Sequence, residues 1–111
     1  MRKYLNKSAV KGNAITKEPD KVAQIFKVLS DGTRLRIIEL LKPRSRCVNA
    51  LAHELGISPA AVSQHLRILR TSGIVEADKR GYFVHYRVNR QNIAVWRKIA
   101  QHVLRLDKKG G

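Results

Sequence analysis

Apolar residues first recur at helical spacing between Pro19 and Leu29. They return every three or four positions, as one face of an α-helix requires: Val22, Ile25, Phe26 and Leu29. Pro19 and Asp20 suit a first turn, where a missing backbone N–H costs nothing. The pattern therefore predicts a first helix from Pro19 to Leu29.

The next stretch, "TRLRIIELL", carries apolar residues around most of its circumference. Asp31 or Thr33 can cap its start, and Pro43 ends it because the residue before a proline avoids the helical conformation. We expect a second helix here that is largely buried.

Two short helices then meet at a glycine in "CVNALAHELGISPAAVSQHLRILRTSGIV". The first has an apolar stripe that includes Leu51 and Ala52, and Gly56 can adopt the positive φ that ends a helix. The spacing of Ala52, Gly56 and Val62 supplies a small residue at a helix crossing, a turn glycine and a wedge into the core. This spacing is typical of a helix-turn-helix, although an ordinary helical hairpin could also carry it.

The second of these helices has two unlike faces. Ser58 is a good N-cap and Pro59 suits the first helical position. Val62, Leu66 and Leu69 form the inward face, with Ala61 and Ile68 to one side. The outward face is small and polar at its start and basic towards its end: Ala60, Ser63, Gln64, Arg67, Arg70 and Thr71. A slim outward face can approach another surface closely.

After Gly73 the apolar period changes from that of a helix to two. Tyr82, Val84, Tyr86 and Val88 alternate with other side chains, and "DKRG" between Asp78 and Gly81 supplies a hairpin turn. A hairpin with Lys79 and Arg80 at its tip, directly after a recognition helix, predicts a winged helix. A structural hairpin with a solvated tip is the alternative.

A last helix is expected from Asn92 to Leu106, with apolar residues over about half of its circumference. So wide a stripe favours two packing partners, of which a second copy of the chain is the simplest. We predict a homodimer, although the chain's own fold could also cover this helix. The expected interface residues come from the first and last helices: Val22, Ile25, Phe26, Ile93, Trp96, Ile99, Ala100 and Val103.

The predicted fold class is mostly α with a β-hairpin wing: four helices, two strands and a fifth helix in a homodimeric winged helix-turn-helix. Residues 18–107 form this DNA-binding and dimerisation domain. Residues 1–17, with five basic and no acidic side chains, are expected to be a mobile basic arm. The arm is either a solvated tail or a segment that follows DNA.

Charge narrows the choice of partner. The 111 residues contain 23 Lys and Arg against 8 Asp and Glu, a net charge of +15. Such an excess favours a polyanion, first nucleic acid and second an anionic membrane. No apolar run approaches the roughly 20 residues of a membrane span, so we expect no membrane partner and a cytoplasmic protein. The single cysteine, Cys47, excludes an intrachain disulfide.

Three segments together resemble the ArsR/SmtB family of winged helix-turn-helix repressors: "LSDGTRLRIIELL", "ALAHELGISPAAVSQHLRILRTSGIV" and "KRGYFVHYRV". The likeness runs from about Val22 to Val103 in the family's order. It implies a dimer of five-helix protomers with a two-stranded wing, joined through the terminal helices.

The family's metal ligands are mostly missing from this chain. Where members that sense soft metals have a Cys-x-Cys pair, "CVN" keeps Cys47 but has Asn49 in the second position. The ligand positions of the last helix in other members correspond to Arg90, Asn92, Val103 and Leu106. We therefore expect no metal and no cofactor, and the sequence names no effector. Cys47 is either an inert packed side chain or a redox group that forms a sulfenic acid or an intersubunit disulfide.

The predicted function is sequence-specific binding of duplex DNA by a repressor that recognises an inverted-repeat operator. Ser63 and Gln64 would read base edges, and Ala60 and Ala61 would contact thymine methyl groups. The complete predicted DNA-binding set is Ser58, Pro59, Ala60, Ala61, Ser63, Gln64, His65, Arg67, Arg70, Lys79 and Arg80. The last four are expected to hold phosphates, and His65 either contacts a phosphate or packs.

Two other functions are compatible with the sequence. One is an architectural protein that coats DNA without sequence preference, and the other is an antitoxin-like module whose last helix binds another protein. No enzyme is expected, because no phosphate-binding glycine loop, metal cluster or nucleophile with a base is recognisable.

Overall fold

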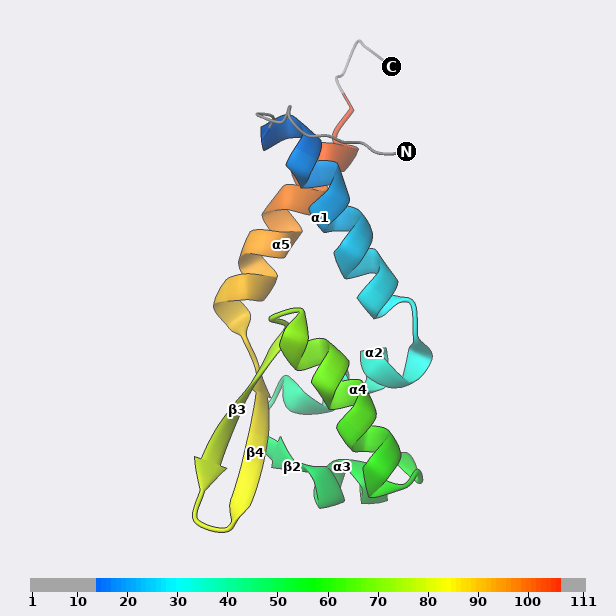
Figure 1. The fold of residues 1–111 in the computed structure, drawn as a ribbon, viewed down its shortest axis with the longest axis vertical. Helices are drawn as coiled ribbons and strands as arrows, with labels where there is room; N and C mark the ends of the chain where they lie inside the picture. The colour runs from blue at the N-terminus through cyan, green and yellow to red at the C-terminus, as the bar shows by residue number, and fades with distance from the viewer. Residues whose placement is uncertain (1–13, 107–111) are drawn as a thin grey trace.

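The computed structural model describes residues 14–106, with side chains from residue 19 onward. Helices and strands follow one another in the order α1 (Ala14–Leu29), α2 (Gly32–Leu41), β2 (Arg46–Cys47), α3 (Val48–Leu55), α4 (Pro59–Thr71), β3 (Val75–Arg80), β4 (Phe83–Val88) and α5 (Arg90–Leu104). Helices α1 and α5 lie side by side at one end of the molecule, and α3, α4 and the hairpin lie at the other (Figure 1).

The turn between α3 and α4 is built as the sequence predicts. Gly56 ends α3 with φ +68° in the left-handed region, and the backbone N–H groups of Gly56 and Ile57 both donate to the carbonyl of Ala52, at 2.9 and 3.2 Å. Two residues later, the Ser58 hydroxyl accepts the Ala61 N–H at 3.1 Å and caps α4. These bonds set the angle at which α4 leaves the turn.

The core lies between α2, α3, α4 and the inner face of the hairpin. Its buried side chains come from every one of these elements: Ile37, Leu41, Leu51, Ala52, Val62, Leu66, Leu69, Ile74, Val75 and Val88, together with Ile25 of α1. The inward face predicted for α4 is confirmed, since Val62, Leu66 and Leu69 are at most 1% exposed.

Two expectations about burial are wrong. In α2 only Ile37 and Leu41 are buried, and Leu35 is 46% exposed. This helix packs against α1, α3, α4 and β4, but these elements do not cover all of its wide apolar stripe. Ile68, expected beside the inward face of α4, is 41% exposed.

The sheet has one strand more than predicted. Arg46–Cys47 forms the short strand β2, which pairs antiparallel with the outer edge of β4 and makes the order β2-β4-β3. Its two residues carry no alternation that could reveal a strand.

The hairpin turn lies further along the chain than predicted. Asp78 and Lys79 are in strand β3, and the last pair of the ladder is Arg80 with Phe83. Gly81 takes φ +63°, the positive value that two-residue hairpin turns need at their first position. The tip is therefore Gly81–Tyr82.

The terminal helices both start earlier than predicted. α1 begins at Ala14, and Pro19 lies inside it, so residues 14–17 of the predicted arm are helical, whereas residues 1–13 lie outside the described part of the chain. α5 begins at Arg90 because Asn89 caps it, its side-chain oxygen accepting the Asn92 N–H at 3.0 Å.

Replacing Gly56 by alanine should test the turn. Nothing lies within 4 Å of a Cβ at this position, so the cost is conformational, about 1 kcal/mol in the free energy of unfolding for a left-handed alanine. Urea denaturation at one protein concentration measures it. Gly32→Ala is the control, since its Cβ would meet only the Arg36 side chain, at 3.7 Å, and no loss is expected. Equal losses would contradict this explanation.

Candidate nucleic-acid interface

The outward face of α4 is accessible to solvent. Ala60, Ser63, Gln64, Arg67 and Arg70 are all exposed, and α4 lies at the front of the view in Figure 1. Their side chains form no hydrogen bond or ion pair with any other described residue. Because burial of the opposite face fixes the rotation of the helix, these donors and acceptors point towards solvent.

The first turn of α4 is also accessible, but one of its hydrogen-bond acceptors is already occupied. Ser58 and Pro59 are exposed, while the Ser58 oxygen is occupied by the Ala61 N–H. Ala61 is half-buried. The first turn therefore offers mainly backbone N–H groups, which favour an anion such as a phosphate.

His65 faces the protein and not the outside. Its Nδ1 lies 3.4 Å from Nη1 of Arg34 and 4.0 Å from a carboxylate oxygen of Asp31. The Arg34 Nε donates to the carbonyl of Val28 at 2.6 Å. Asp31 and Arg34 thereby connect the end of α1 and the start of α2 to His65 of α4.

Sequence reasoning identified Asp31 only as a helix cap. Its side chain does cap α2 by accepting the Arg34 N–H at 3.1 Å. That backbone hydrogen bond is the main reason why the pKa of Asp31 is lowered. Partial burial opposes the shift, and the charges of His65 and Arg34 add to it.

The two basic residues of the wing lie on opposite faces of the hairpin. Lys79 pairs with Val84 and Arg80 pairs with Phe83, and neighbouring positions along a strand point to opposite sides. The Arg80 Nε lies 3.2 Å from a carboxylate oxygen of Asp78, whereas Lys79 has no such partner among the described residues. A flat surface against the wing would therefore meet one of the two first.

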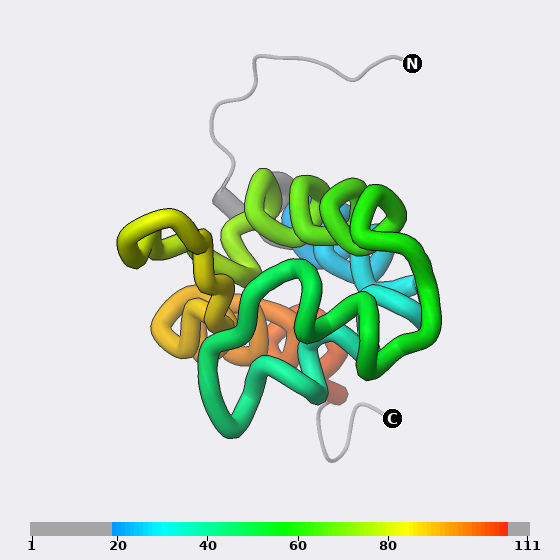
Figure 2. Tube along the Cα trace, turned by 90° about the horizontal axis from the view of Figure 1, so that it is seen from below, coloured from blue at the N-terminus to red at the C-terminus, as the bar shows by residue number. Residues whose placement is uncertain are grey.

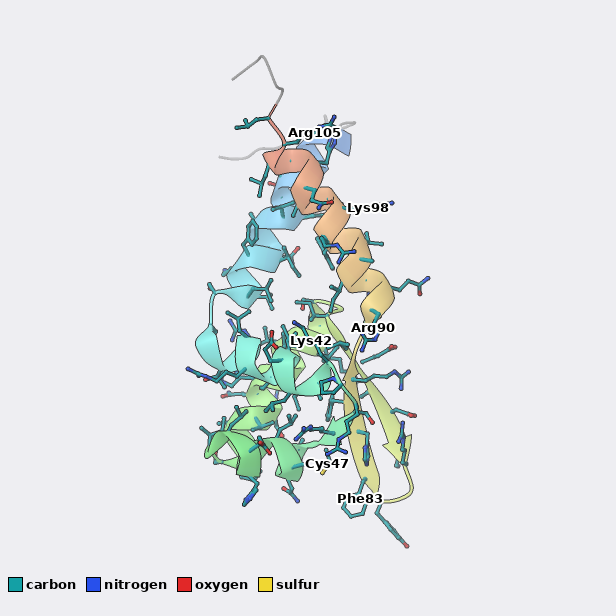
Figure 3. The ribbon with its side chains drawn as sticks, turned by 180° about the vertical axis from the view of Figure 1, so that it is seen from behind. Lys42, Cys47, Phe83, Arg90, Lys98 and Arg105 are labelled. Carbon is teal, nitrogen blue, oxygen red and sulfur yellow. The ribbon has the colours of Figure 1, made fainter. Side chains whose placement is uncertain are left out.

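The extreme tip of the wing is aromatic. Tyr82 is fully exposed and Phe83 is 60% exposed, and Phe83 lies at the far end of the hairpin in Figure 3. The pattern "DKRG" predicts a turn at Asp78–Gly81 and therefore a basic tip, and this prediction is wrong because strand β3 continues to Arg80. The dipeptide after Gly81 was the signal that could have revealed an aromatic tip.

The predicted dimer residues fall into three groups. Val22 and Ile25 are only 4% and 5% exposed in the protomer, so they have little surface left for a partner. Ile93 and Trp96 are half-buried against the protomer's core. The others retain accessible surface: Phe26, Ile99, Ala100 and Val103.

Helix α5 has no fully buried side chain, although one of its sides is apolar. Val95 and Leu104, which the sequence analysis did not assign to the interface, are 51% and 63% exposed. Phe26 of the neighbouring α1 is 48% exposed. The paired helices α1 and α5 therefore present apolar surface at the end of the molecule away from the helix-turn-helix (Figure 3).

Cys47 occupies the N-cap of α3, is half-buried and pairs in register with His85 of β4. The next position that could ligate a soft metal beside it holds the exposed amide of Asn49. Within residues 14–106, no three His, Cys, Asp or Glu side chains come together as a group that could hold a metal ion. The residues present at α3 thus do not fit a two-thiolate centre.

None of the helices that the structure describes is both long enough and apolar enough to cross a membrane.

Comparisons with known proteins agree with this geometry. Residues 31–77 match the family model described as bacterial regulatory protein, arsR family. The transcriptional repressor SdpR of Bacillus subtilis is 34% identical over 65 residues, which are 59% of this chain and 72% of SdpR. The arsenical resistance operon repressor of Escherichia coli is 42% identical over 74 residues, which are 66% of this chain and 62% of that protein.

Among solved structures, a homodimeric winged helix-turn-helix DNA-binding domain from Mycobacterium bovis superposes with a TM-score of 0.69. It is described as a possible ArsR-family transcriptional regulator, is 31% identical and covers 86% of this chain and 89% of its own. The similarity therefore extends beyond the helix-turn-helix to most of the fold.

The Asp31 carboxylate should stabilise the fold near neutral pH, and this contribution should be lost in acid. Because its folded-state pKa lies below the ordinary value of 3.8, its contribution is present above that value and is lost as the pH falls through the folded-state pKa. Asp31→Asn keeps a capping oxygen but should remove this pH dependence below about pH 4. Thermal denaturation between pH 2.5 and 6 measures how the stability of each variant depends on pH, and Asp20→Asn at an exposed position serves as the control. A pH profile unchanged by Asp31→Asn would contradict the assignment.

Proposed function

This chain belongs to the ArsR family of DNA-binding transcriptional regulators, and we propose that it represses transcription by binding a specific duplex operator as a homodimer. The observation that carries the proposal is the outward face of α4, whose polar and basic side chains are exposed without partners in the protein. A regulator of this kind works in the cytoplasm, where it blocks a promoter by occupying it.

Gln64 and Ser63 are the residues proposed to read bases. The Gln64 amide can pair with N6 and N7 of adenine in the major groove, and the small Ala60 allows the helix to approach a thymine methyl group. Half-buried Ala61 has a smaller part in this contact than Ala60. The position of both readers in the first half of α4 suits a recognition helix that enters the groove by its N-terminal end.

Phosphate contacts are assigned to Arg67 and Arg70 on α4, with Lys79 and Arg80 on the wing. All four are exposed, and the net charge of +15 gives the chain a strong attraction to a polyanion. About 6 to 10 phosphate contacts per dimer would make the affinity fall steeply with salt. Arg80 would have to leave Asp78 to reach DNA.

The homodimer is proposed to form through the exposed apolar surface of α1 and α5. Burying Phe26, Val95 and Leu104 against a second copy would remove the largest apolar side chains that these helices leave in water. Two recognition helices in successive major grooves would lie about 34 Å apart, so the operator would be an inverted repeat with half-sites about 10 base pairs apart.

Regulation is proposed not to use the two-thiolate metal site of soft-metal sensors, because Asn49 stands in its second position. Cys47 alone could still act through a sulfenic acid or an intersubunit disulfide.

Selection of binding sites from a random duplex library in about 150 mM salt tests base reading by Gln64. We expect an inverted-repeat consensus for the wild type. Gln64→Ala should bind this consensus 5- to 150-fold more weakly, which corresponds to about 1–3 kcal/mol for one bidentate base contact. Gln101→Ala, an exposed glutamine on α5, serves as the matched control and should bind like wild type.

The operator proposal would be wrong if the selection enriched no motif and the chain still bound duplexes tightly, with an affinity that increased with duplex length. That result would favour an architectural protein. A wild-type chain that is monomeric and binds no duplex would instead favour the antitoxin-like interaction module.

Phe26→Glu should dissociate the dimer, because it places a charge in the proposed apolar interface without disturbing the protomer's core. Sedimentation analysis at about 10 µM should show a dimer for wild type and a monomer for the variant, with an unchanged helical circular-dichroism spectrum. Ala23→Glu makes the same change in charge at an exposed position on α1 and should remain dimeric. A dimeric Phe26→Glu variant would exclude this surface from the interface.

A further inference from the structure

We propose that this protein has a second ligand site, an arginine-lined hollow that binds a multiply charged phosphate-type anion. The hollow has two adjoining lobes between the wing and the connection from α2 to α3. One lobe of about 420 Å³ is lined by Arg44, Ser45, Arg46, Cys47, Ala50, Arg80 and His85. The other lobe, of about 210 Å³, shares Arg44, Ser45 and Arg80 with the first and is also lined by Lys42, Arg87 and Arg90.

All of the charged side chains that line this anion hollow are basic. Five arginines and one lysine reach it, and neither lobe has an aspartate or glutamate among its lining residues. Acidic partners lie outside the lining: Glu54 pairs with Arg46, and Asp78 and Glu76 pair with Arg80 and Arg87. Arg44 has no ion pair with any described residue. Like charges held this close favour a bound counter-anion.

Two nitrogen atoms of residues that line the larger lobe have no hydrogen-bond partner among the described residues. They are Nε of Arg46 and Nδ1 of His85, both buried from solvent. Only 18% of the Arg46 side chain is exposed, and its one acidic partner, Glu54, is half-exposed at 3.6 Å. Glu54 is thus the one acidic partner of Arg46 among the described residues, and an anion in the hollow would add a second.

The shape and chemistry of the hollow select the ligand class. Its larger lobe lies in the size range of small-molecule sites, about 300–1,000 Å³. Guanidinium groups bind phosphate oxygens through paired N–H donors, and the Ser45 hydroxyl can donate as well. The two lobes share Arg44 and Arg80, so a ligand with two or more phosphate groups could engage both.

The anion hollow is separate from the outward face of α4. None of the α4 residues proposed to contact DNA lines either lobe, and the segment between α2 and α3 lies on the side of the molecule away from α4 (Figure 2). Figure 3 views the molecule from this other side, where Lys42 and Arg90 lie close together above Cys47. The Arg90 Nη2 donates to the Lys42 carbonyl at 2.6 Å and ties the start of α5 to this region.

Arg80 connects the hollow to DNA binding, in a step that rests on the proposed function. It lines both lobes and is also one of the proposed phosphate contacts of the wing. An anion that holds Arg80 in the hollow withdraws it from DNA, so the anion should weaken the operator complex, and DNA should weaken anion binding by the same factor. The hollow is thereby an effector site.

Binding of inorganic pyrophosphate to the full chain tests the site without DNA. Calorimetry in about 100 mM NaCl should detect binding by wild type, and ¹H–¹⁵N spectra should shift at Ser45, Cys47 and His85. Arg44→Gln should raise the Kd at least tenfold, as loss of a charge-assisted contact predicts. Arg105→Gln on the exposed end of α5 changes the net charge equally and should leave the Kd unchanged.

Equal weakening of pyrophosphate binding by both variants would overturn the site, because binding would then follow only the overall charge. Unchanged pyrophosphate binding by Arg44→Gln would overturn it as well.

Operator binding of Arg44→Gln distinguishes the source of the phosphate. An unchanged operator affinity with loss of pyrophosphate inhibition supports a free small-molecule effector. Arg44→Gln could instead bind pyrophosphate as tightly as wild type but bind the operator more weakly, with the slope of log K against log salt concentration reduced by about one. In that case the hollow holds the DNA backbone, and the effector proposal is wrong. Because pyrophosphate binding is measured without DNA, it stands or falls independently of the repressor assignment.

Discussion

The burial of Val62, Leu66 and Leu69 against α2 and α3 is the packing on which the rest of this structure depends. These three side chains are essentially inaccessible, and together they fix the rotation of α4 about its own axis. Truncating one of them would cost several kcal/mol, a large part of the stability of a domain this size. Because the rotation is fixed, Gln64 and Arg67 cannot turn inward, and the helix presents the same polar face to any partner.

Polar contacts add to this packing by fixing the start of α4 and by joining its middle to neighbouring elements. The cap at Ser58 and the left-handed Gly56 determine where α4 starts, while Asp31, Arg34 and His65 connect its middle to the end of α1. α1 packs against α5, whose apolar surface we assign to the dimer. The contacts of Val28, Arg34 and His65 therefore join the end of α1 to α4.

The wing divides its chemistry between two faces. Its inner face, with Val75, Tyr86 and Val88, belongs to the core, and its outer face carries the ion pairs of Arg87 and Arg80 with Glu76 and Asp78. The short strand β2 adds Cys47 beside His85 at the edge. That extra strand brings Arg44 and Arg46 close to Arg80, with which they line the anion hollow.

Local patterns determined most of the secondary structure and the two faces of α4, because helix caps, a turn glycine and apolar periodicity act over a few residues. Ser58, Pro59, Gly56 and the Val62–Leu69 stripe were all readable in this way. Tertiary structure alone decided the burial of Val22 and Ile25 within the protomer, the exposure of Leu35, the inward direction of His65 and the third strand. Each of these depends on which elements pack together, and a side chain's own neighbours in the chain do not carry that information. The anion hollow has the same origin, since Arg44, Arg46 and Arg80 come together only when β2 pairs with β4.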